Sequence, residues 1–133
     1  MTSRMFAIAL GLLAAAAPAR AETWRASSSD GNASAFIDAD SIVRTGDQVR
    51  FRRELRWPEV RLLGNRLRYN RLLADYEGDC RAMTLRSLSV AAKLDDEVVL
   101  AGEGSGEIEQ ARPGSTAEVD LRSACFGEWP AAR

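Results

Sequence analysis

The side chains that most often carry catalysis are scarce in this sequence. The 133 residues include no histidine, which removes the commonest general base and the commonest metal ligand. The one lysine, Lys93, falls in a predicted turn, where we expect a solvated charge rather than an activated amine. With no base to activate a nucleophile, we expect a protein that is not an enzyme and that binds no cofactor.

Two short stretches resemble ligand sites without completing them. Asp38 and Asp40 begin a calcium-loop pattern, but Val43 and Val49 stand where that loop needs glycine and glutamate. We therefore expect no metal site, and we interpret the two aspartates as turn formers. The glycines of residues 102–106 lack the spacing of a phosphate loop, and glutamates within and after them would repel phosphate, so we expect a flexible loop.

Charge is segregated along the chain. Residues 50–71 hold eight arginines and two acids, whereas residues 95–120 hold eight acids and one base. One interpretation is a basic patch that binds a protein or a polyanion such as a sulfated glycan, with Arg50, Arg52 and Arg56 as the contacts. The alternative is that basic and acidic strands lie side by side and their charges pair across the sheet. We expect no nucleic-acid partner, because the chain carries no net positive charge.

The first residues have the pattern of an export signal. Arg4 precedes an apolar run of 13 residues, Met5 to Ala17, and Ala19-Arg20-Ala21 supplies the small residues that signal peptidase recognises. We expect cleavage after Ala21, so that residues 1–21 are a signal peptide and residues 22–133 form one domain. A transmembrane anchor is the alternative, but a spanning helix needs about 20 apolar residues. We therefore expect an exported protein, in the periplasm or at the cell surface, with no membrane span after cleavage.

The two cysteines, Cys80 and Cys125, are predicted to form a disulfide, as an even number of cysteines does in exported proteins. It would close a loop of 45 residues and stabilise the fold by about 4 kcal/mol in the chain-entropy model. Free thiols and a metal site are the alternatives. Zinc is disfavoured because a structural zinc site needs four sulfur or nitrogen ligands.

The elements that would position these side chains are short strands followed by one helix. The clearest strand is residues 49–57, in which alternate residues from Val49 to Trp57 face a core and Arg50, Arg52, Glu54 and Arg56 face outward. Pro58 is predicted to end this strand or to mark a sheet edge, and residues 59–65 to form a connection. Further strands are predicted at residues 23–28, 35–38, 42–44, 67–76, 81–91 and 97–101.

The C-terminal segment is predicted to be a helix. Ser115 and Glu118 fit a capping box, in which each side chain accepts a hydrogen bond from the other residue's amide. Ala117, Leu121 and Cys125 then lie on one face, so the disulfide would tie the helix to the sheet. The tail from Gly127, including Trp129, is predicted to fray. The pattern as a whole predicts an α+β domain: an antiparallel sheet of about five to six strands packed by one C-terminal helix.

Several short motifs occur in an order that resembles the surface-adhesin protein E-like family of bacterial exported proteins. They are Trp24, Phe36-Ile37-Asp38, Ser41-Ile42, Gly46 with Val49, Asp79-Cys80, Pro113-Gly114-Ser115 and Ala124-Cys125-Phe126. The resemblance implies a small antiparallel sheet joined to a C-terminal helix by one disulfide. It also implies a surface protein that binds host matrix or plasma proteins, often as a homodimer. The chain departs from the pattern at Ile108, where an aromatic is expected. The alternative function is a periplasmic accessory protein of an envelope complex.

Overall fold

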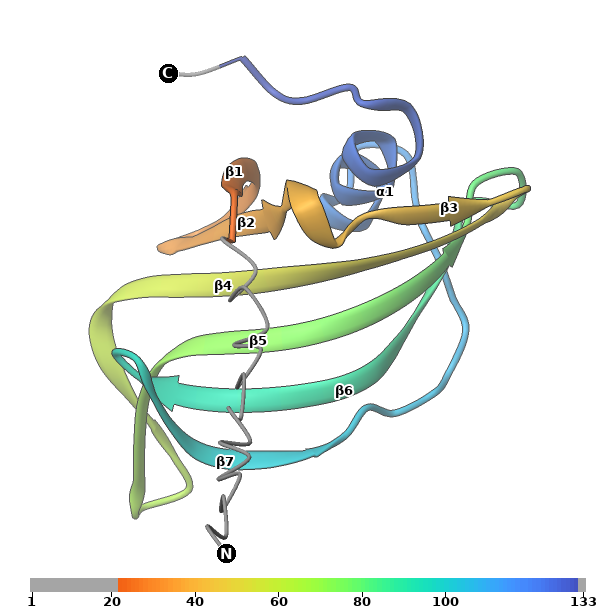
Figure 1. Ribbon diagram of the computed structural model, residues 1–133. Coiled ribbons are helices and arrows are strands. Elements are labelled where there is room, and N and C mark those ends of the chain that lie inside the picture. Colours follow the sequence, from red (N-terminus) through yellow and green to blue (C-terminus); the bar gives the residue numbers. More distant parts are fainter. Residues whose placement is uncertain (1–21, 132–133) are drawn as a thin grey trace, which may run out of the picture.

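The structure is a computed structural model that describes residues 22–131. The predicted signal peptide, residues 1–21, lies outside the described residues. Residues 22–131 form an antiparallel sheet of eight strands and one C-terminal α-helix, α1 (Figure 1). The main path of the sheet runs β1-β2-β4-β5-β6-β7, with β3 paired to β4 and β8 paired to β6. Within this part of the chain, no helix has the length and hydrophobicity of a membrane span.

The predicted α+β class, with its helix at the C-terminus, is confirmed. The six strands of the main path match the upper end of the expected number, and the two further strands are short edge additions. The elements are β1 Trp24–Asp30, β2 Ala33–Asp38, the 3-10 turn η1 Ala39–Ser41, β3 Val43–Thr45, β4 Gln48–Leu63, β5 Leu67–Asp79, β6 Thr84–Leu94, β7 Glu97–Glu103, β8 Glu109–Gln110 and α1 Thr116–Phe126.

The sheet has two chemically different faces, set by the alternation of β4. On the inner face, Val49 and Phe51 are buried beneath α1 in a core that also holds Ile37 and Leu121. A Cβ at Gly78 would lie 2.6 Å from the Leu121 side chain, so glycine permits the close approach of helix and sheet. The opposite side of the sheet, which we call the outer face, carries Arg50, Arg52, Glu54 and Arg56 on β4, as the alternation predicts.

The helix is capped at its N-terminus and tied to the sheet at its C-terminus. Ser115 accepts a hydrogen bond from the Glu118 amide at 3.2 Å, as predicted, but the Glu118 carboxylate accepts from the Gly114 amide instead of the Ser115 amide. At the other end, Cys125 forms the predicted disulfide with Cys80, whose Cα lies 5.7 Å away. The Arg44 guanidinium donates to the Cys125 carbonyl at 2.6 Å, where a helix end attracts positive charge.

Pro58 does not end the long strand, but it does lie at a sheet edge, the other predicted alternative, because β2 pairs with β4 only as far as Arg56. β4 continues to Leu63 and β5 begins at Leu67, so residues 59–63, expected to be part of a connection, are strand. The register between the two strands shifts between Arg56 and Arg61, and Pro58 lies inside that irregular stretch. A missing backbone donor is tolerated there because the regular ladder is already interrupted.

Two other local predictions are also wrong. The strand predicted at residues 67–76 extends to Asp79, and the strand predicted to begin at residue 81 begins at Thr84, because residues 80–83 form the turn. Trp129, expected to fray, packs against the hydrophobic core, and the Arg25 guanidinium lies 4.3 Å from its ring centroid. The apolar contacts that the Trp129 ring makes stabilise the tail by more than the conformational entropy that the tail loses.

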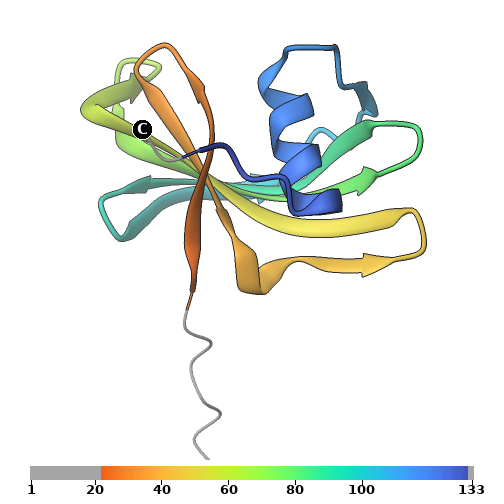
Figure 2. The same ribbon diagram turned by 90° about the horizontal axis from the view of Figure 1, so that it is seen from above.

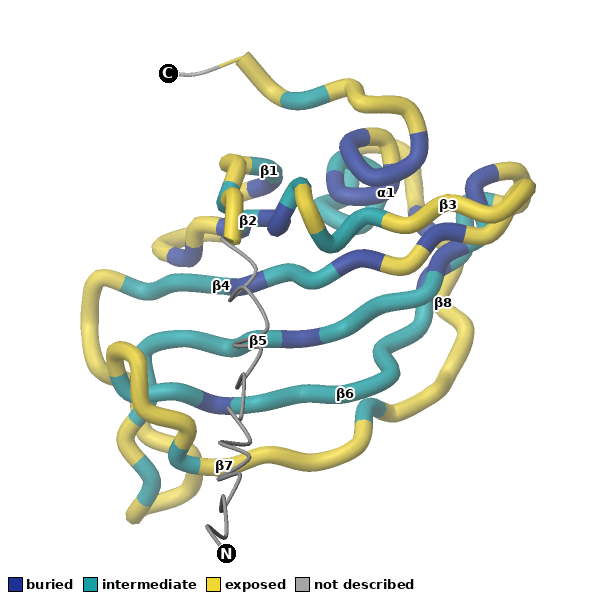
Figure 3. Tube along the Cα trace, viewed as in Figure 1, coloured by how far each residue is buried: buried dark blue, intermediate teal, exposed yellow. Residues whose placement is uncertain are grey.

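The far end of the β4–β5 hairpin leaves the plane of the sheet. We call residues 58–68 the hairpin tip. Seen from above, the yellow-green tip curls toward the side of the sheet that carries the blue helix (Figure 2). Most of the tip is exposed, whereas the middle of the same two strands is buried or half-buried (Figure 3).

Candidate functional site

The three arginines predicted as contacts, Arg50, Arg52 and Arg56, lie together on the outer face of β4. They alternate with Phe51, Arg53 and Leu55, which face the helix side, as residues two apart share a face of a strand. Each of the three predicted arginines lies within ion-pairing distance of a carboxylate on β4 or β5. The outer face is therefore a set of charge pairs and not a field of free cations.

The first row of charges runs across β4, β5 and β6 through Glu77. Its cross-strand neighbours Arg50 and Arg86 approach the carboxylate at 3.0 Å and 2.8 Å. Hydrogen bonds from Arg86, and then from Arg50, hold the pKa of Glu77 below its usual value. The Arg50 side chain is 68% exposed, so its guanidinium remains accessible to the carboxylate of a partner.

The second row joins Arg52, Asp75 and Ser89. The Arg52 Nε lies 2.9 Å from Asp75 Oδ1, and the Ser89 hydroxyl donates to Asp75 Oδ2 at 2.9 Å. Burial by itself would raise the pKa of Asp75, but the hydrogen bonds from Arg52 and Ser89 outweigh it and lower that pKa. The same contact with Asp75 raises the pKa of Arg52. This row is fully charged at neutral pH.

The third row is built around Glu54, a carboxylate whose side chain is only 2% exposed. Arg56, Lys93 and Arg71 place nitrogens 2.7, 3.4 and 3.8 Å from its oxygens. The Arg56 guanidinium also lies 4.2 Å from the ring centroid of Phe36, which screens the pair from water. A buried carboxylate needs such partners, because leaving it unpaired is costly.

The roles of two charged residues in this third row were not foreseen. Lys93, expected to be a solvated turn residue, lies inside β6, and its side chain is 16% exposed and faces Glu54. Glu54 itself was expected to face solvent. The one hint in the sequence was that Glu54 is a single acid among the arginines of β4. Its burial could not be predicted from that strand, because it depends on neighbours from β2, β5 and β6.

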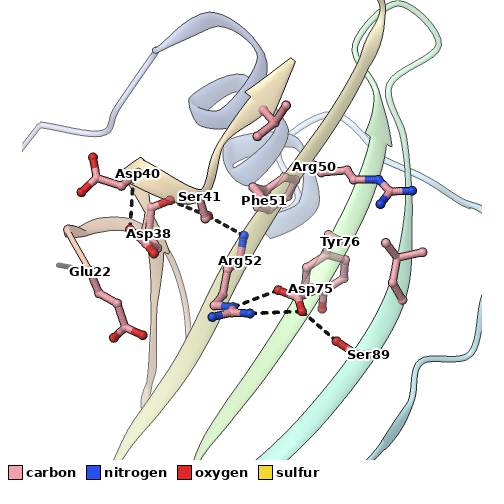
Figure 4. Close-up of a pocket in the computed structure, with 12 residues that line it drawn as sticks. Glu22, Asp38, Asp40, Ser41, Arg50, Phe51, Arg52, Asp75, Tyr76 and Ser89 are labelled. Carbon is pink, nitrogen blue, oxygen red and sulfur yellow. Dashed lines mark hydrogen bonds and ion pairs between the residues drawn. The ribbon is translucent and has the colours of Figure 1, made fainter. Parts of the chain in front are cut away.

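The outer face also contains a hollow of about 480 Å³ (Figure 4). Arg50, Arg52 and Asp75 from the sheet form its floor, and Asp40 and Ser41 of η1 form one wall. The Arg52 amide donates to the Ser41 hydroxyl at 2.8 Å, which fixes that wall to β4. The lining includes two guanidinium groups, from Arg50 and Arg52. It also includes four carboxylates: Glu22, Asp38, Asp40 and Asp75.

The acidic segment at residues 95–120 supplies only two of the partners of the arginine cluster. Asp96 pairs with Arg71 at 3.2 Å. Asp120, on α1, forms an ion pair with Arg53, with 2.7 Å between Asp120 Oδ2 and Arg53 Nε. The Nε–H of Arg53 does not point at the carboxylate, so this ion pair is not also a hydrogen bond. Asp120 also accepts hydrogen bonds from the hydroxyls of Ser27 and Ser28, so it joins the helix to β1 and β4.

Of the two predicted turn formers, Asp38 behaves as expected, whereas the Asp40 carboxylate accepts a hydrogen bond from the Thr23 hydroxyl and not from a nearby amide. The Asp38 carboxylate accepts hydrogen bonds from the Thr23 and Asp40 amides at 3.0 and 3.1 Å, which stabilises η1. Among residues 22–131, no three acidic or cysteine side chains cluster in a way that could hold a metal ion. Arg50, Arg52 and Arg56 remain predicted binding residues, now with their charge partners identified.

Comparison with known proteins gives one match. The family model described as Surface-adhesin protein E matches residues 24–126, which span the sheet and the helix from β1 to the end of α1. No curated protein and no solved structure shows significant similarity to the chain.

Proposed function

Because the chain belongs to the surface-adhesin protein E family, we propose that it is an exported, non-enzymatic binding protein of the bacterial envelope. Its partner is a protein, and the contact surface is the outer face around the hollow. The single observation that carries this proposal is the pair of accessible guanidinium groups, Arg50 and Arg52, at the floor of that hollow.

The charges of the hollow favour a protein partner over a sulfated glycan. Four carboxylates and two guanidinium groups line it, so the site as a whole repels a polyanion. A protein surface carries both signs of charge and can pair with Arg50 and Arg52 while its own basic side chains meet Asp40 and Asp75. Such complementarity sets specificity and the rate of association more than raw affinity.

The non-enzymatic assignment rests on the chemistry of the same residues. The acids that border Arg50 and Arg52 are held as carboxylates by arginine hydrogen bonds, which lower the pKa of both Asp75 and Glu77. A general acid or base at neutral pH needs a pKa shifted toward 7, in the opposite direction. This arrangement suits recognition of charge and not proton transfer.

Binding is tested with an Arg50→Gln/Arg52→Gln double variant on immobilised host matrix and plasma proteins at low and high salt. We expect binding of the unchanged protein that weakens with salt, and about tenfold weaker binding of the variant, the loss of ~1.4 kcal/mol. Arg56 is left in place because its removal would take a partner from the buried Glu54. An Arg81→Gln/Arg112→Gln variant removes the same charge from exposed positions outside the hollow and should bind normally.

A double variant that binds like the unchanged protein would show that the contact residues are wrong. Failure of the unchanged protein to bind any host protein, with co-purification of an envelope protein, would favour the accessory function instead.

Location is tested separately by treating intact cells with an external protease, with a periplasmic protein as the leakage control. We expect the tagged protein to be cleaved while the control survives, as a surface location requires. Survival until the outer membrane is opened would place the protein in the periplasm and remove the host-binding role.

A further inference from the structure

The arginines of residues 50–71 divide into two groups in the structure. Five of them lie within 4.0 Å of a carboxylate: Arg50, Arg52, Arg53, Arg56 and Arg71. The other three, Arg61, Arg66 and Arg68, belong to the hairpin tip and have no ion-pair partner among residues 22–131. Glu59 is the one acid of the tip. The tip therefore carries a net positive charge that the fold does not neutralise.

Apolar side chains are exposed beside these arginines. Leu62 and Leu63 are 61% and 49% exposed, and Val60 is 44% exposed. Side chains alternate along a strand, so Val60 and Leu62 share one face of the hairpin tip and Leu63 lies on the other. Single exposed leucines are ordinary on protein surfaces, but exposed apolar side chains on both faces of a protruding hairpin favour contact with a partner.

Aromatic side chains mark the base of the tip. The rings of Trp57 and Tyr69 meet edge to face with centroids 5.8 Å apart, and the Arg61 guanidinium lies 5.0 Å from the Trp57 centroid. Tryptophan and tyrosine combine an apolar ring with a polar group, and for that reason they favour the boundary between lipid and water. From the base outward, the two rings are followed by Arg61, then by Leu62 and Leu63 with Arg68 opposite Leu62, and last by the turn of residues 64–66, which carries Arg66.

The two strands of the tip are paired with each other along their inner edges. Arg61 pairs with Tyr69, Leu62 with Arg68 and Leu63 with Leu67 across the hairpin. Unpaired backbone groups are costly where water is scarce, and the outer edges of the tip have no neighbouring strand in the described chain, so the contact expected is with the hydrated headgroup region and not with the hydrocarbon core.

We propose that the hairpin tip binds a lipid bilayer surface that carries anionic phosphate headgroups. Leu62 and Leu63 enter the headgroup region, and Arg66 and Arg68 pair with lipid phosphates, for which guanidinium geometry is well suited. Trp57 lies at the interface. This contact uses the opposite end of the β4–β5 hairpin from the hollow, so it does not depend on the proposed protein partner.

Charge argues against a second copy of the chain as the occupant. In a two-fold symmetric dimer the same patch faces itself, so the unpaired arginines of the two tips would approach one another. An anionic bilayer offers both the apolar layer and the countercharge that the tip lacks.

The test is sedimentation with vesicles of phosphatidylcholine containing phosphatidylglycerol, and with vesicles of phosphatidylcholine alone. We expect binding to the anionic vesicles and little to the neutral ones. Arg66→Gln/Arg68→Gln should weaken binding roughly 25-fold, at about fivefold per arginine near an anionic surface. Leu62→Ser/Leu63→Ser should weaken it about tenfold, because less apolar surface enters the bilayer.

Matched controls use the same substitutions elsewhere. Arg81→Gln/Arg112→Gln removes equal charge, and Val98→Ser/Leu100→Ser removes exposed apolar side chains from β7; both should bind like the unchanged protein. Circular dichroism confirms that each variant is folded.

Four results would overturn the proposal. The first is absence of binding to anionic vesicles, and the second is equal binding by the tip variants and the controls. The third is a change in oligomeric state of the leucine variant in lipid-free solution, which would show that a second copy covers the tip. Loss of binding in the arginine variant alone, with complete competition by heparin, would also overturn insertion and leave only attraction to a polyanion.

Discussion

The body of the β4–β5 hairpin and its tip are made by the same two strands, yet among residues 22–131 the arginines of the body have ion-pair partners and those of the tip do not. In the body, which we define as residues 48–57 and 70–79, arginines meet Glu54, Asp75 and Glu77. In the tip, residues 58–68, the arginines have no ion-pair partner within the described chain, and leucines are exposed between them.

The difference comes from the neighbouring strands. β2 pairs with β4 only as far as Arg56, and β6 pairs with β5 only as far as Arg71. The body therefore lies inside a sheet whose neighbours supply counter-charges and cover, whereas the tip is a two-stranded ribbon without them. Pairing of charge in this protein follows from the number of adjacent strands, and not from the local density of arginine.

The largest expected effect that separates the two regions is on stability. Glu54→Gln leaves Arg56 and Lys93 without their shared buried carboxylate, so we expect a loss of about 3 kcal/mol in the free energy of unfolding. Glu59→Gln, on the same strand but exposed in the tip, should change it by less than about 0.5 kcal/mol. Urea unfolding of both variants measures the contrast. Equal stability of the two would show that Glu54 is not the centre of a buried charge cluster.

Local patterns predicted much of this arrangement. The alternation of β4 correctly placed Arg50, Arg52 and Arg56 on one face, because the side chains of a strand alternate whatever its neighbours are. The capping residue Ser115 and the Cys80–Cys125 disulfide were likewise predicted from residue types alone.

Features that depend on register between distant strands were not predictable in this way. The burial of Glu54 requires Phe36 from β2 and Lys93 from β6 to meet it, and no pattern within β4 specifies those partners. Pro58 was expected to end its strand or to lie at a sheet edge. The edge is confirmed, but the continuation of β4 past Pro58 depends on pairing with β5, which no pattern within β4 specifies.

A medium effect is expected when the carboxylates of the body are protonated. The pKa values of Asp75 and Glu77 are lowered in the folded protein, so the unfolded state binds more protons as pH falls below their ordinary values of about 3.9 and 4.3. Their contribution to stability is full above that range and is lost as pH falls through the lower folded-state values.

The measurement is the urea midpoint between about pH 6 and pH 2. Arg86→Gln removes the largest hydrogen bond to Glu77 and should make the decline with falling pH shallower. Arg66→Gln, in the tip, should leave the slope as it is in the unchanged protein. An unchanged slope in Arg86→Gln would mean that the first row contributes nothing to the acid sensitivity.

The smallest expected effect is on the folding of the tip itself. Leu62→Ser and Leu63→Ser replace side chains that are already largely exposed in the folded state, so little apolar burial is lost. Each should change the free energy of unfolding by less than about 0.5 kcal/mol, whereas Leu121→Ala in the core should cost about 2–5 kcal/mol. A loss of more than about 1 kcal/mol at Leu62 or Leu63 would mean that the tip is packed in solution. If the Leu62 and Leu63 variants instead keep the free energy of unfolding but bind vesicles more weakly, these side chains contribute to contact with a surface and not to the stability of the domain.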